Sequence, residues 1–346
     1  MTIIIGIVGK PSSGKSTFLN AACLTNAKVS EVPFTTIDPN KGVAYVKIDC
    51  LCQKLGLNDN PKNSICIDGK RFIPINLLDV AGLVPDAHKG KGLGNQFLND
   101  LSKADALLHI VDISGSLDQM GKHIGEGIND PYDDILFLEN EINLWFNEIL
   151  KREDWDKFLK NFSREKGKFI DELYTRLSGI KVNKKQIVDA LKKSNLENEN
   201  PSSWSEDDLI NFSKTLREIS KPIIIIANKI DKEIGKKKYY ELTDKFKEKI
   251  IPCSALAEFV LREFEKRGII EYLQGSNKFK VIMEEKLSIK EAETLKNIQK
   301  KILDEFGSTG IQEILNYVAF KTTDQICVYP VSDINNYSDN SGNVLP

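Results

Sequence analysis

Six short apolar runs rich in β-branched residues are spaced along the chain. They cover residues 3–8, 42–48, 72–79, 106–112, 222–228 and 250–253. Segments with the apolar spacing of helices separate them, and strands that alternate with helices are typical of a mostly parallel sheet covered on both faces. The pattern therefore predicts an α/β fold.

The alternation is interrupted between residues 112 and 222, where the sequence has no strand signal. This interval is too long for one crossover connection in a compact sheet. Near its two ends, apolar residues recur at spacings of three and four: Ile135, Leu138, Ile142, Trp145 and Ile149, and then Leu209, Phe212, Leu216 and Ile219. These seams predict an inserted α-helical coiled-coil domain in which two helices pair antiparallel. Ser205 and Asp208 predict a capping box at the start of the second helix.

After residue 255 the helical pattern continues, most clearly over residues 287–306, and residues 325–330 then predict a new strand. This strand would begin a small β-rich unit, and the residues up to 346 are too few for an independent core. We therefore expect four parts, with a sheet domain formed by two of them. The parts are residues 1–131, 132–220, 221–322 and 323–346.

The composition limits the classes of protein to consider. Hydrophobic residues make up 41% of the chain, yet no apolar run approaches the roughly 20 residues that span a bilayer. A strand-like run near the N-terminus takes the place of a signal peptide, so we expect a cytoplasmic protein without a membrane segment. The net charge of -2 excludes a strong global attraction to nucleic acid. Residues 151–193 are locally basic, with 13 Lys/Arg against 7 Asp/Glu, which is typical of a solvated helical surface or of an RNA or ribosome contact.

Six cysteines without a regular framework indicate a reducing compartment. Cys50, Cys52 and Cys66 are close in sequence and could supply three zinc ligands or form one disulfide. Their spacing fits no standard zinc pattern and no fourth ligand is obvious, so we expect packed or plain thiols.

The segment Gly9-Lys10-Pro11-Ser12-Ser13-Gly14-Lys15-Ser16 matches the phosphate-binding loop pattern G-x-x-x-x-G-K-[ST] between a strand and a helix. Backbone N–H groups of such a loop face phosphate oxygens, the lysine ammonium bridges the β- and γ-phosphates, and the last hydroxyl binds Mg²⁺. The residues expected to hold the nucleotide here are Gly9, Pro11, Ser12, Ser13, Gly14, Lys15, Ser16 and Thr17.

Two further segments complete a triphosphate and Mg²⁺ site. Asp79-Val80-Ala81-Gly82 ends an apolar strand in the D-x-x-G arrangement, in which Asp79 holds Mg²⁺ and the Gly82 N–H touches the γ-phosphate. Residues 33–36, which read PFTT, lie where a phosphate-sensing loop belongs, and Thr36 is the expected Mg²⁺ ligand, with Thr35 as the alternative.

The base is assigned by Asn228-Lys229-Ile230-Asp231, which follows another apolar strand. An ionised Asp231 can accept hydrogen bonds from N1–H and the exocyclic amine of guanine, whereas adenine offers an acceptor at N1 and has no 2-amine. Residues Ser254, Ala255 and Leu256 follow the next strand, where backbone N–H groups can contact guanine O6.

Together these residues resemble the Obg superfamily of GTPases and, within it, the archaeal type of the YchF branch, also called Obg-like ATPases. Residues 33–40 (PFTTIDPN), 79–84 (DVAGLV) and 90–97 (GKGLGNQF) carry the likeness, which extends over nearly the whole chain. The resemblance implies a G domain, an inserted coiled-coil domain, and the opening of a C-terminal TGS domain over residues 324–346. It also implies a link to the ribosome or the translation machinery.

The same resemblance leaves the nucleotide and the turnover open. Bacterial and eukaryotic members prefer ATP and have altered base-recognition residues, but Asn228, Lys229 and Asp231 are intact here, so we favour GTP and keep ATP as the alternative. Leu83 stands where many GTPases have a water-orienting glutamine, which predicts slow hydrolysis or a nucleotide-gated scaffold with negligible turnover. His123 resembles the flexible-loop histidine of the family and is the candidate to assist hydrolysis.

Three expectations complete the sequence-based description. His109 lies within a predicted strand and should be a core residue, and His88 has no assigned role. A small-molecule kinase would need an arginine-rich lid and has no use for the segment from Asn228 to Asp231. We expect the chain to be a monomer.

Overall fold

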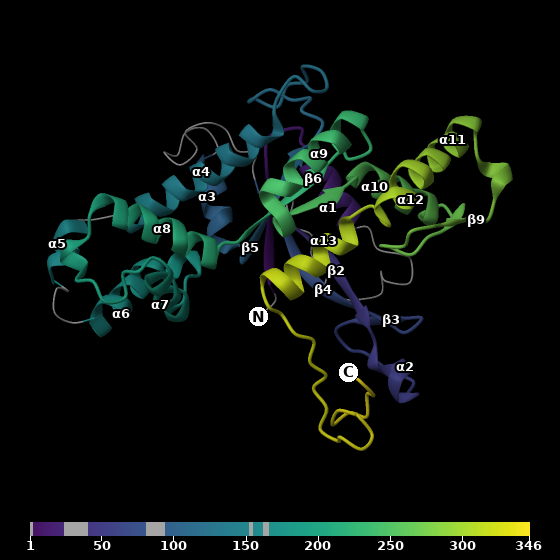
Figure 1. Cartoon of the computed structure of the whole chain (residues 1–346). Helices are drawn as coiled ribbons and strands as arrows, with labels where there is room; N and C mark the ends of the chain where they lie inside the picture. The colour runs from purple at the N-terminus through teal and green to yellow at the C-terminus, as the bar shows by residue number, and fades with distance from the viewer. Residues whose placement is uncertain (1–2, 24–40, 81–93, 152–154, 162–165) are drawn as a thin grey trace.

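The main sheet provides the frame of the molecule. The computed structural model describes residues 3–23, 41–80, 94–151, 155–161 and 166–346. Within them, the seven strands of this sheet are β1 (Ile4–Val8), β2 (Lys41–Asp49), β3 (Ile65–Ile67), β4 (Lys70–Asp79), β5 (Ala106–Asp112), β6 (Ile223–Asn228) and β7 (Ile250–Cys253). Their order is β2-β4-β1-β5-β6-β7, and β3 pairs with the beginning of β4 (Figure 1).

The sheet is mostly parallel. Strands β4, β1, β5, β6 and β7 run in one direction, whereas β2 and β3 are antiparallel to β4. The predicted α/β fold is therefore confirmed. The sequence did not predict β3, because a strand of three half-buried residues produces no extended apolar run.

Helices cover both faces of the sheet, which explains why all seven residues of β5 are buried. On one face, Leu108 and Ile110 pack in the core that includes α1 (Lys15–Cys23) and α13 (Ile311–Tyr317). On the other face, Leu107 packs with α3 (Gly94–Lys103), and Val111 packs with α4 (Pro131–Leu150) and α9 (Glu233–Phe246). Parallel strands buried on both faces give the continuous apolar runs seen in the sequence.

A group of helices projects from the sheet on the side of α3 and α4 (Figure 1). It contains α5 (Trp155–Asn161), α6 (Lys166–Leu177), α7 (Lys184–Lys193) and α8 (Glu206–Ser220). Arg217 near the end of α8 pairs with Glu139 in the first half of α4, and Lys151 after α4 pairs with Glu206 at the start of α8. The two helices are therefore antiparallel, as predicted, and the capping box of Ser205 and Asp208 is present.

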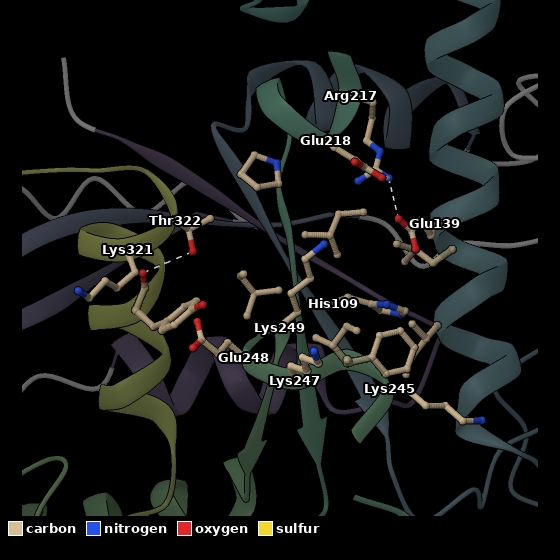
Figure 2. A pocket seen from close by; sticks show the side chains of 18 residues that line it. His109, Glu139, Arg217, Glu218, Lys245, Lys247, Glu248, Lys249, Lys321 and Thr322 are labelled. Carbon is tan, nitrogen blue, oxygen red and sulfur yellow. Dashed lines mark hydrogen bonds and ion pairs between the residues drawn. The ribbon is translucent and has the colours of Figure 1, made fainter. Parts of the chain in front are cut away.

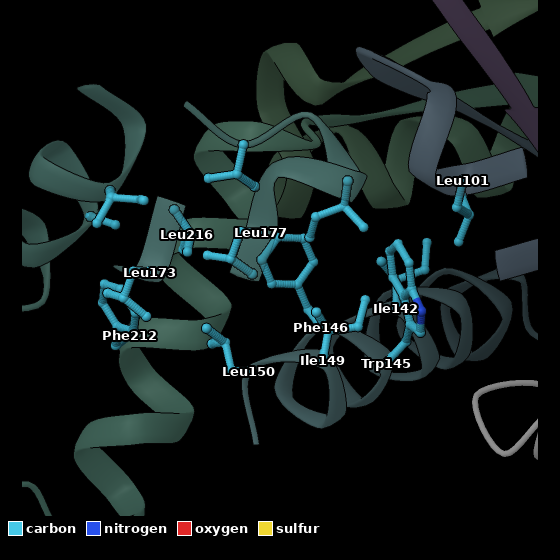
Figure 3. Packing of buried hydrophobic residues seen from close by; sticks show 14 of the residues in the cluster. Leu101, Ile142, Trp145, Phe146, Ile149, Leu150, Leu173, Leu177, Phe212 and Leu216 are labelled. Atoms are coloured by element: carbon cyan, nitrogen blue, oxygen red, sulfur yellow. The ribbon is translucent and has the colours of Figure 1, made fainter. Parts of the chain in front are cut away.

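One hydrophobic core continues from the sheet into these helices, as Figure 3 shows. Leu101 on α3 contributes at one end, the aromatic rings of Trp145 and Phe146 on α4 lie in the middle, and Phe212 on α8 lies farther out. The residues of both predicted seams are buried, except Ile219, which is half-buried. Burial of this stripe holds the inserted helices against the sheet domain.

Several smaller elements complete the fold. The helix α2 (Leu51–Leu55) lies near the sheet edge. The chain after β7 forms α10 (Ala255–Lys266), β8 (Ile270–Glu271), β9 (Lys280–Val281), α11 (Ile289–Ile298) and α12 (Asp304–Phe306). Short 3-10 turns cover Ser178–Ile180, Pro201–Ser203, Lys247–Lys249 and Glu284–Lys286, and π-helical turns cover Gln299–Leu303 and Val318–Thr322. The helical pattern predicted over residues 287–306 is confirmed.

The strand predicted over residues 325–330 is wrong, because this segment has no regular secondary structure. A strand needs a neighbour to receive its backbone hydrogen bonds. Instead the segment runs away from α13 toward α2 and β3 (Figure 1), and its Tyr329 ring lies 5.0 Å from the Arg71 guanidinium. Isolated bridges join Asp333, Ser338 and Val344 further along.

Among the helices of the described ranges, none is both long and apolar enough to cross a membrane.

Candidate functional site

The loop between β1 and α1 has the backbone of a phosphate-binding loop. Gly9 and Gly14 have φ angles of 146° and 103°, and Ser12 also has a positive φ of 62°. A Cβ on Gly9 would lie 2.4 Å from the carbonyl oxygen of Ile110 in β5, so only glycine fits there. The loop ends at the N-terminus of α1, whose free N–H groups attract anions. Gly9 and residues 11–17, which are predicted to hold the nucleotide, thus lie together on this loop and the first turn of α1.

The Lys15 ammonium lies within the curve of the loop. Its Nζ donates hydrogen bonds to the carbonyl oxygens of Gly9, at 3.1 Å, and Lys10, at 2.8 Å. Burial lowers the pKa of Lys15, and the nearby charge of Asp79 acts in the opposite direction. An ammonium held this way in a buried position is placed to meet a phosphate, because opposite charges attract more strongly where water is excluded.

Ser16 and Asp79 are brought together from distant parts of the sequence. The Ser16 hydroxyl donates to Asp79 Oδ2 at 3.1 Å, across the parallel pair of β1 and β4. Asp79 Oδ1 is buried without a hydrogen-bond partner among the described residues, and burial raises the pKa of this carboxyl. Oxygen donors of this kind are the ligands that Mg²⁺ prefers. Two of the three predicted metal ligands therefore fit the ion.

Asn228 connects the phosphate loop to the base-recognition segments. Its Nδ2 donates to the carbonyl oxygen of Ser13 at 2.9 Å, and its Oδ1 accepts from the Ala255 N–H at 3.1 Å. The side chain is buried, with 3% of its surface exposed. Asn228 therefore connects the end of β6 to the phosphate loop and to the start of α10. The sequence alone did not predict these contacts.

Lys229 pairs with a carboxylate that sequence reasoning missed. Its Nζ lies 2.9 Å from Asp112 Oδ2 at the end of β5, and Ser114 and Ser116 also donate to this carboxylate. Burial alone raises the pKa of Asp112, but the hydrogen bonds that it receives hold the pKa below its usual range. Asp112 ends an apolar strand as Asp79 does, and that shared position was the available signal.

Asp231 and Ser254 form the rim of the base side. The Ser254 hydroxyl donates to Asp231 Oδ1 at 2.8 Å and also accepts from the Ala257 N–H as the N-cap of α10. A cavity of about 490 Å³ is lined by Asp231, Ser254 and the exposed Leu256. The predicted base-recognition residues therefore lie at one end of the sheet, next to a cavity.

Several predicted site residues lie outside the described part of the chain, namely Thr35, Thr36, Gly82, Leu83 and His88. His123 is described and exposed, and it forms a bridge with Leu117 in the loop after β5. Gly121 of this loop packs on the phosphate loop, since a Cβ there would lie 2.5 Å from the Pro11 carbonyl oxygen. The loop that carries His123 therefore reaches the phosphate side, while the role of His123 stays a prediction.

A second cavity, of about 780 Å³, lies away from this site, near the start of β6 (Figure 2). Arg217 at its wall is already paired with Glu139 at 2.7 Å. His109 also lines it, and the imidazole is 2% exposed, so His109 is the core residue that we predicted. None of the residues that line this cavity belongs to the phosphate loop, which follows β1 at the opposite end of the strands.

Comparison with known proteins agrees with this geometry. Residues 4–141 match the family described as "50S ribosome-binding GTPase", and residues 226–333 match "Obg-like GTPase YGR210-like, G4 motif-containing domain". The "Uncharacterized GTP-binding protein MJ1332" of Methanocaldococcus jannaschii is 44% identical over 99% of this chain and 85% of its own length. "Obg-like ATPase 1" of Homo sapiens is 31% identical over 79% of this chain and 66% of its own length.

A solved structure extends the likeness to the fold. The crystal structure of a GTP-binding protein from Pyrococcus horikoshii OT3 superposes with a TM-score of 0.76 at 37% identity, and the match covers 99% of this chain and 84% of that one. Taken with the two sequence relatives and the arrangement of the phosphate loop, this places the chain among P-loop GTPases, and it belongs to the YchF/Obg-like GTPase family.

Proposed function

We propose that this protein is a Mg²⁺-dependent switch that binds GTP and hydrolyses it slowly. The single observation that carries the proposal is the arrangement around Asn228, which joins the phosphate loop at Ser13 to the base side at Ala255. A rigid connection of this kind sets the distance between triphosphate and base before the nucleotide arrives.

The preference for GTP rests on Asp231. A carboxylate fixed by the Ser254 hydroxyl can accept hydrogen bonds from N1–H and the 2-amino group of guanine. Adenine would place a lone pair against the same carboxylate and has no 2-amino donor. Sites built on such hydrogen bonds reject the analogue that lacks them by roughly 10⁴-fold. An ATP-preferring hydrolase remains the second candidate, because Obg-like ATPase 1 is a relative.

In this mechanism Ser16 and Asp79 hold Mg²⁺, together with Thr36, and the ion supplies charge neutralisation of the phosphate oxygens. Lys15 binds the β- and γ-phosphates from inside the loop, and the Gly82 N–H orients the γ-phosphate. Leu83 has no group that could orient an attacking water, so turnover should be slow unless His123 or a partner contributes. The rival function is a nucleotide-gated scaffold with negligible turnover.

We also propose that the four parts expected from the sequence act as a nucleotide domain with a coiled-coil arm and the start of a TGS domain. The locally basic arm, residues 151–193, supports an RNA or ribosome contact through phosphate groups. The description "50S ribosome-binding GTPase" belongs to the matching family and adds support for this partner. A cytoplasmic monomer is the form that we propose.

Calorimetric titration of GTP and ATP with Mg²⁺ tests the base assignment. The wild type should prefer GTP, and Asp231→Asn should lose most of that affinity. The same variant should gain affinity for xanthosine triphosphate. Xanthine has a carbonyl oxygen in place of the 2-amino group of guanine, and the asparagine amide can donate a hydrogen bond to that oxygen. Asp244→Asn, on the exposed face of α9, is the matched control.

Equal affinity of the wild type for ATP and GTP, or equal losses of both in Asp231→Asn, would overturn the guanine assignment. Phosphate release measured on the same samples distinguishes a switch that hydrolyses GTP from a scaffold that only binds it. Tight GTP binding without phosphate release, with and without ribosomes, would favour the scaffold.

A further inference from the structure

Three cysteines and one aspartate meet near the edge of the sheet, far along β2 from the phosphate loop. Cys50 follows β2, Cys52 lies on α2, Cys66 lies on β3, and Asp59 comes from the connection between α2 and β3. Their sulfur and carboxylate oxygen atoms all lie within 4.8 Å of one another. Asp59 is the fourth ligand that the cysteine spacing did not reveal. We propose that these four residues bind one structural Zn²⁺ ion.

Two distances within the cluster are close to those of a tetrahedral site. Cys52 Sγ and Cys66 Sγ are 3.6 Å apart, and Cys50 Sγ and Asp59 Oδ2 are 3.2 Å apart. Thiolate sulfurs about 2.3 Å from zinc at the corners of a tetrahedron are roughly 3.8 Å from each other. Small side-chain movements would complete this geometry. A disulfide between Cys52 and Cys66 would use only two of the four groups.

The local fold explains why these groups converge. Cys50 is the N-cap of α2, and the chain turns back after one and a half turns of helix through Gly56, whose φ is 64°. The antiparallel pairing of β3 with β4 then places Cys66 opposite Arg71. Three adjacent pieces of backbone thus present their side chains to one point, in the manner of a structural zinc site closed by four protein ligands.

Arg71 supplies the charge balance. Three thiolates and one carboxylate carry four negative charges, of which zinc neutralises two. The Arg71 guanidinium is buried, and its Nη2 lies 2.9 Å from Asp59 Oδ2 and 3.4 Å from Cys50 Sγ. A hydrogen-bond donor to the ligands is the usual outer layer of a metal site and fixes their orientation. Each thiol releases its proton to solvent when it binds the ion.

The zinc site would hold the C-terminal segment, residues 329–346, against the edge of the sheet. Arg71 Nη2 also donates to the Leu345 carbonyl oxygen at 2.9 Å, and the Asn60 N–H donates to the Val344 carbonyl oxygen at 2.8 Å. Leu345 packs in the same apolar cluster as Cys50 and Cys52. Zinc is therefore expected to order the path of residues 329–346, which have no strand of their own to hold them.

The full chain, purified without chelator, should contain about one zinc per molecule by elemental analysis. Cobalt(II) in its place should give the intense visible bands of a tetrahedral ion and a thiolate-to-cobalt charge-transfer band. Cys52→Ala and Cys66→Ala should lose the metal, whereas Cys23→Ala should retain it, since Cys23 lies at the other end of β2. GTP binding by each variant reports on the folded sheet domain. Removal of zinc by a zinc-selective chelator, with Mg²⁺ in excess, should speed proteolytic cleavage within residues 329–346 while GTP binding persists.

Two results would overturn the proposal. The first is a wild-type chain that binds GTP but takes up neither zinc nor cobalt with thiolate bands, or that holds iron instead. The second is a denatured wild type with only four free thiols and a disulfide that links Cys52 to Cys66. Six free thiols together with bound zinc would support the site.

Discussion

The Asn228 amide lies against Gly14, so that a Cβ on that glycine would be 2.3 Å from Asn228 Nδ2. The two residues belong to the phosphate loop and to the end of β6, which are far apart in sequence. The contact permits the hydrogen bond from Asn228 to the Ser13 carbonyl oxygen. The phosphate side and the base side of the site are thus joined through one buried amide.

Removal of this amide should weaken nucleotide binding. In Asn228→Ala the Ser13 carbonyl oxygen and the buried Ala255 N–H lose their partner, which costs about 1–3 kcal/mol. We expect GTP affinity to fall by roughly ten- to a hundred-fold, measured by calorimetry. Asn211→Ala, on the exposed face of α8, should bind GTP like the wild type. Unchanged affinity in Asn228→Ala would show that the amide does not organise the site.

A methyl group on Gly14 should have a related effect for a different reason. Gly14→Ala would place a Cβ against Asn228 and force a side chain into a φ of 103°, a strain of about 1–3 kcal/mol. GTP affinity should fall by roughly ten- to a hundred-fold, while circular dichroism remains that of a folded chain. Gly179→Ala is the control, because nothing lies within 4 Å of the position that its Cβ would take.

The combination of these two changes gives a double-mutant cycle. Asn228→Ala removes the atom that the new Cβ meets, so the losses in the double variant should be smaller than the sum of the two single losses. Strictly additive losses would contradict direct contact between the two positions.

Much of the sheet and of the phosphate loop could be predicted from the sequence, because each of these elements is specified by the residues of one short segment. The strand predicted over residues 106–112 has the bounds of β5, because a strand buried on both faces is a continuous apolar run. The phosphate loop is contiguous, so its residue types and spacing specify it. In both cases the information lies within one short segment.

The contacts that complete the two sites depend on how the chain folds back on itself, and the sequence did not predict them. The pairing of Lys229 with Asp112 and the approach of Asp59 to the cysteines depend on strand register and on chain reversals. The strand expected over residues 325–330 failed because alternation alone does not provide a neighbouring strand. Local pattern therefore identified the elements, and tertiary packing decided which side chains meet.

Arg217 should be a main support of the antiparallel pair of α4 and α8. Its buried guanidinium donates to Asn143 Oδ1 and Glu139 Oε1, each at 2.7 Å. Arg217→Met would leave the half-buried Glu139 and Asn143 without this donor. The free energy of unfolding, measured in urea, should fall by about 1–3 kcal/mol. GTP affinity should remain within about two-fold, since the pair lies away from the phosphate loop.

Lys214→Met is the matched control, because Lys214 is exposed on the same helix. Surface charges of this kind contribute less than about 1 kcal/mol. If both variants lose the same free energy of unfolding, the hydrogen bonds from Arg217 to α4 do not stabilise the fold more than a surface charge does.

His109 should make the fold sensitive to acid. Burial lowers the pKa of its imidazole to about 3, and the charges of Lys15 and Lys10 act in the same direction. An unfolded histidine takes up a proton near pH 6.5, so below that pH the unfolded state binds a proton that the folded state refuses. Stability is therefore complete above pH 6.5 and declines as the pH falls toward 3, by at most about 1.4 kcal/mol per pH unit.

Replacement of this imidazole by an apolar group should remove its share of the acid sensitivity. Between pH 6.5 and 5.0, His109→Leu should lose about 1.6 kcal/mol less unfolding free energy than the wild type, measured by urea denaturation at each pH. His123→Gln keeps the buried imidazole and should follow the wild-type curve. If the curves of wild type and His109→Leu run parallel over this range, His109 is protonated without unfolding, and the cavity beside it would then admit the water that such a charge requires.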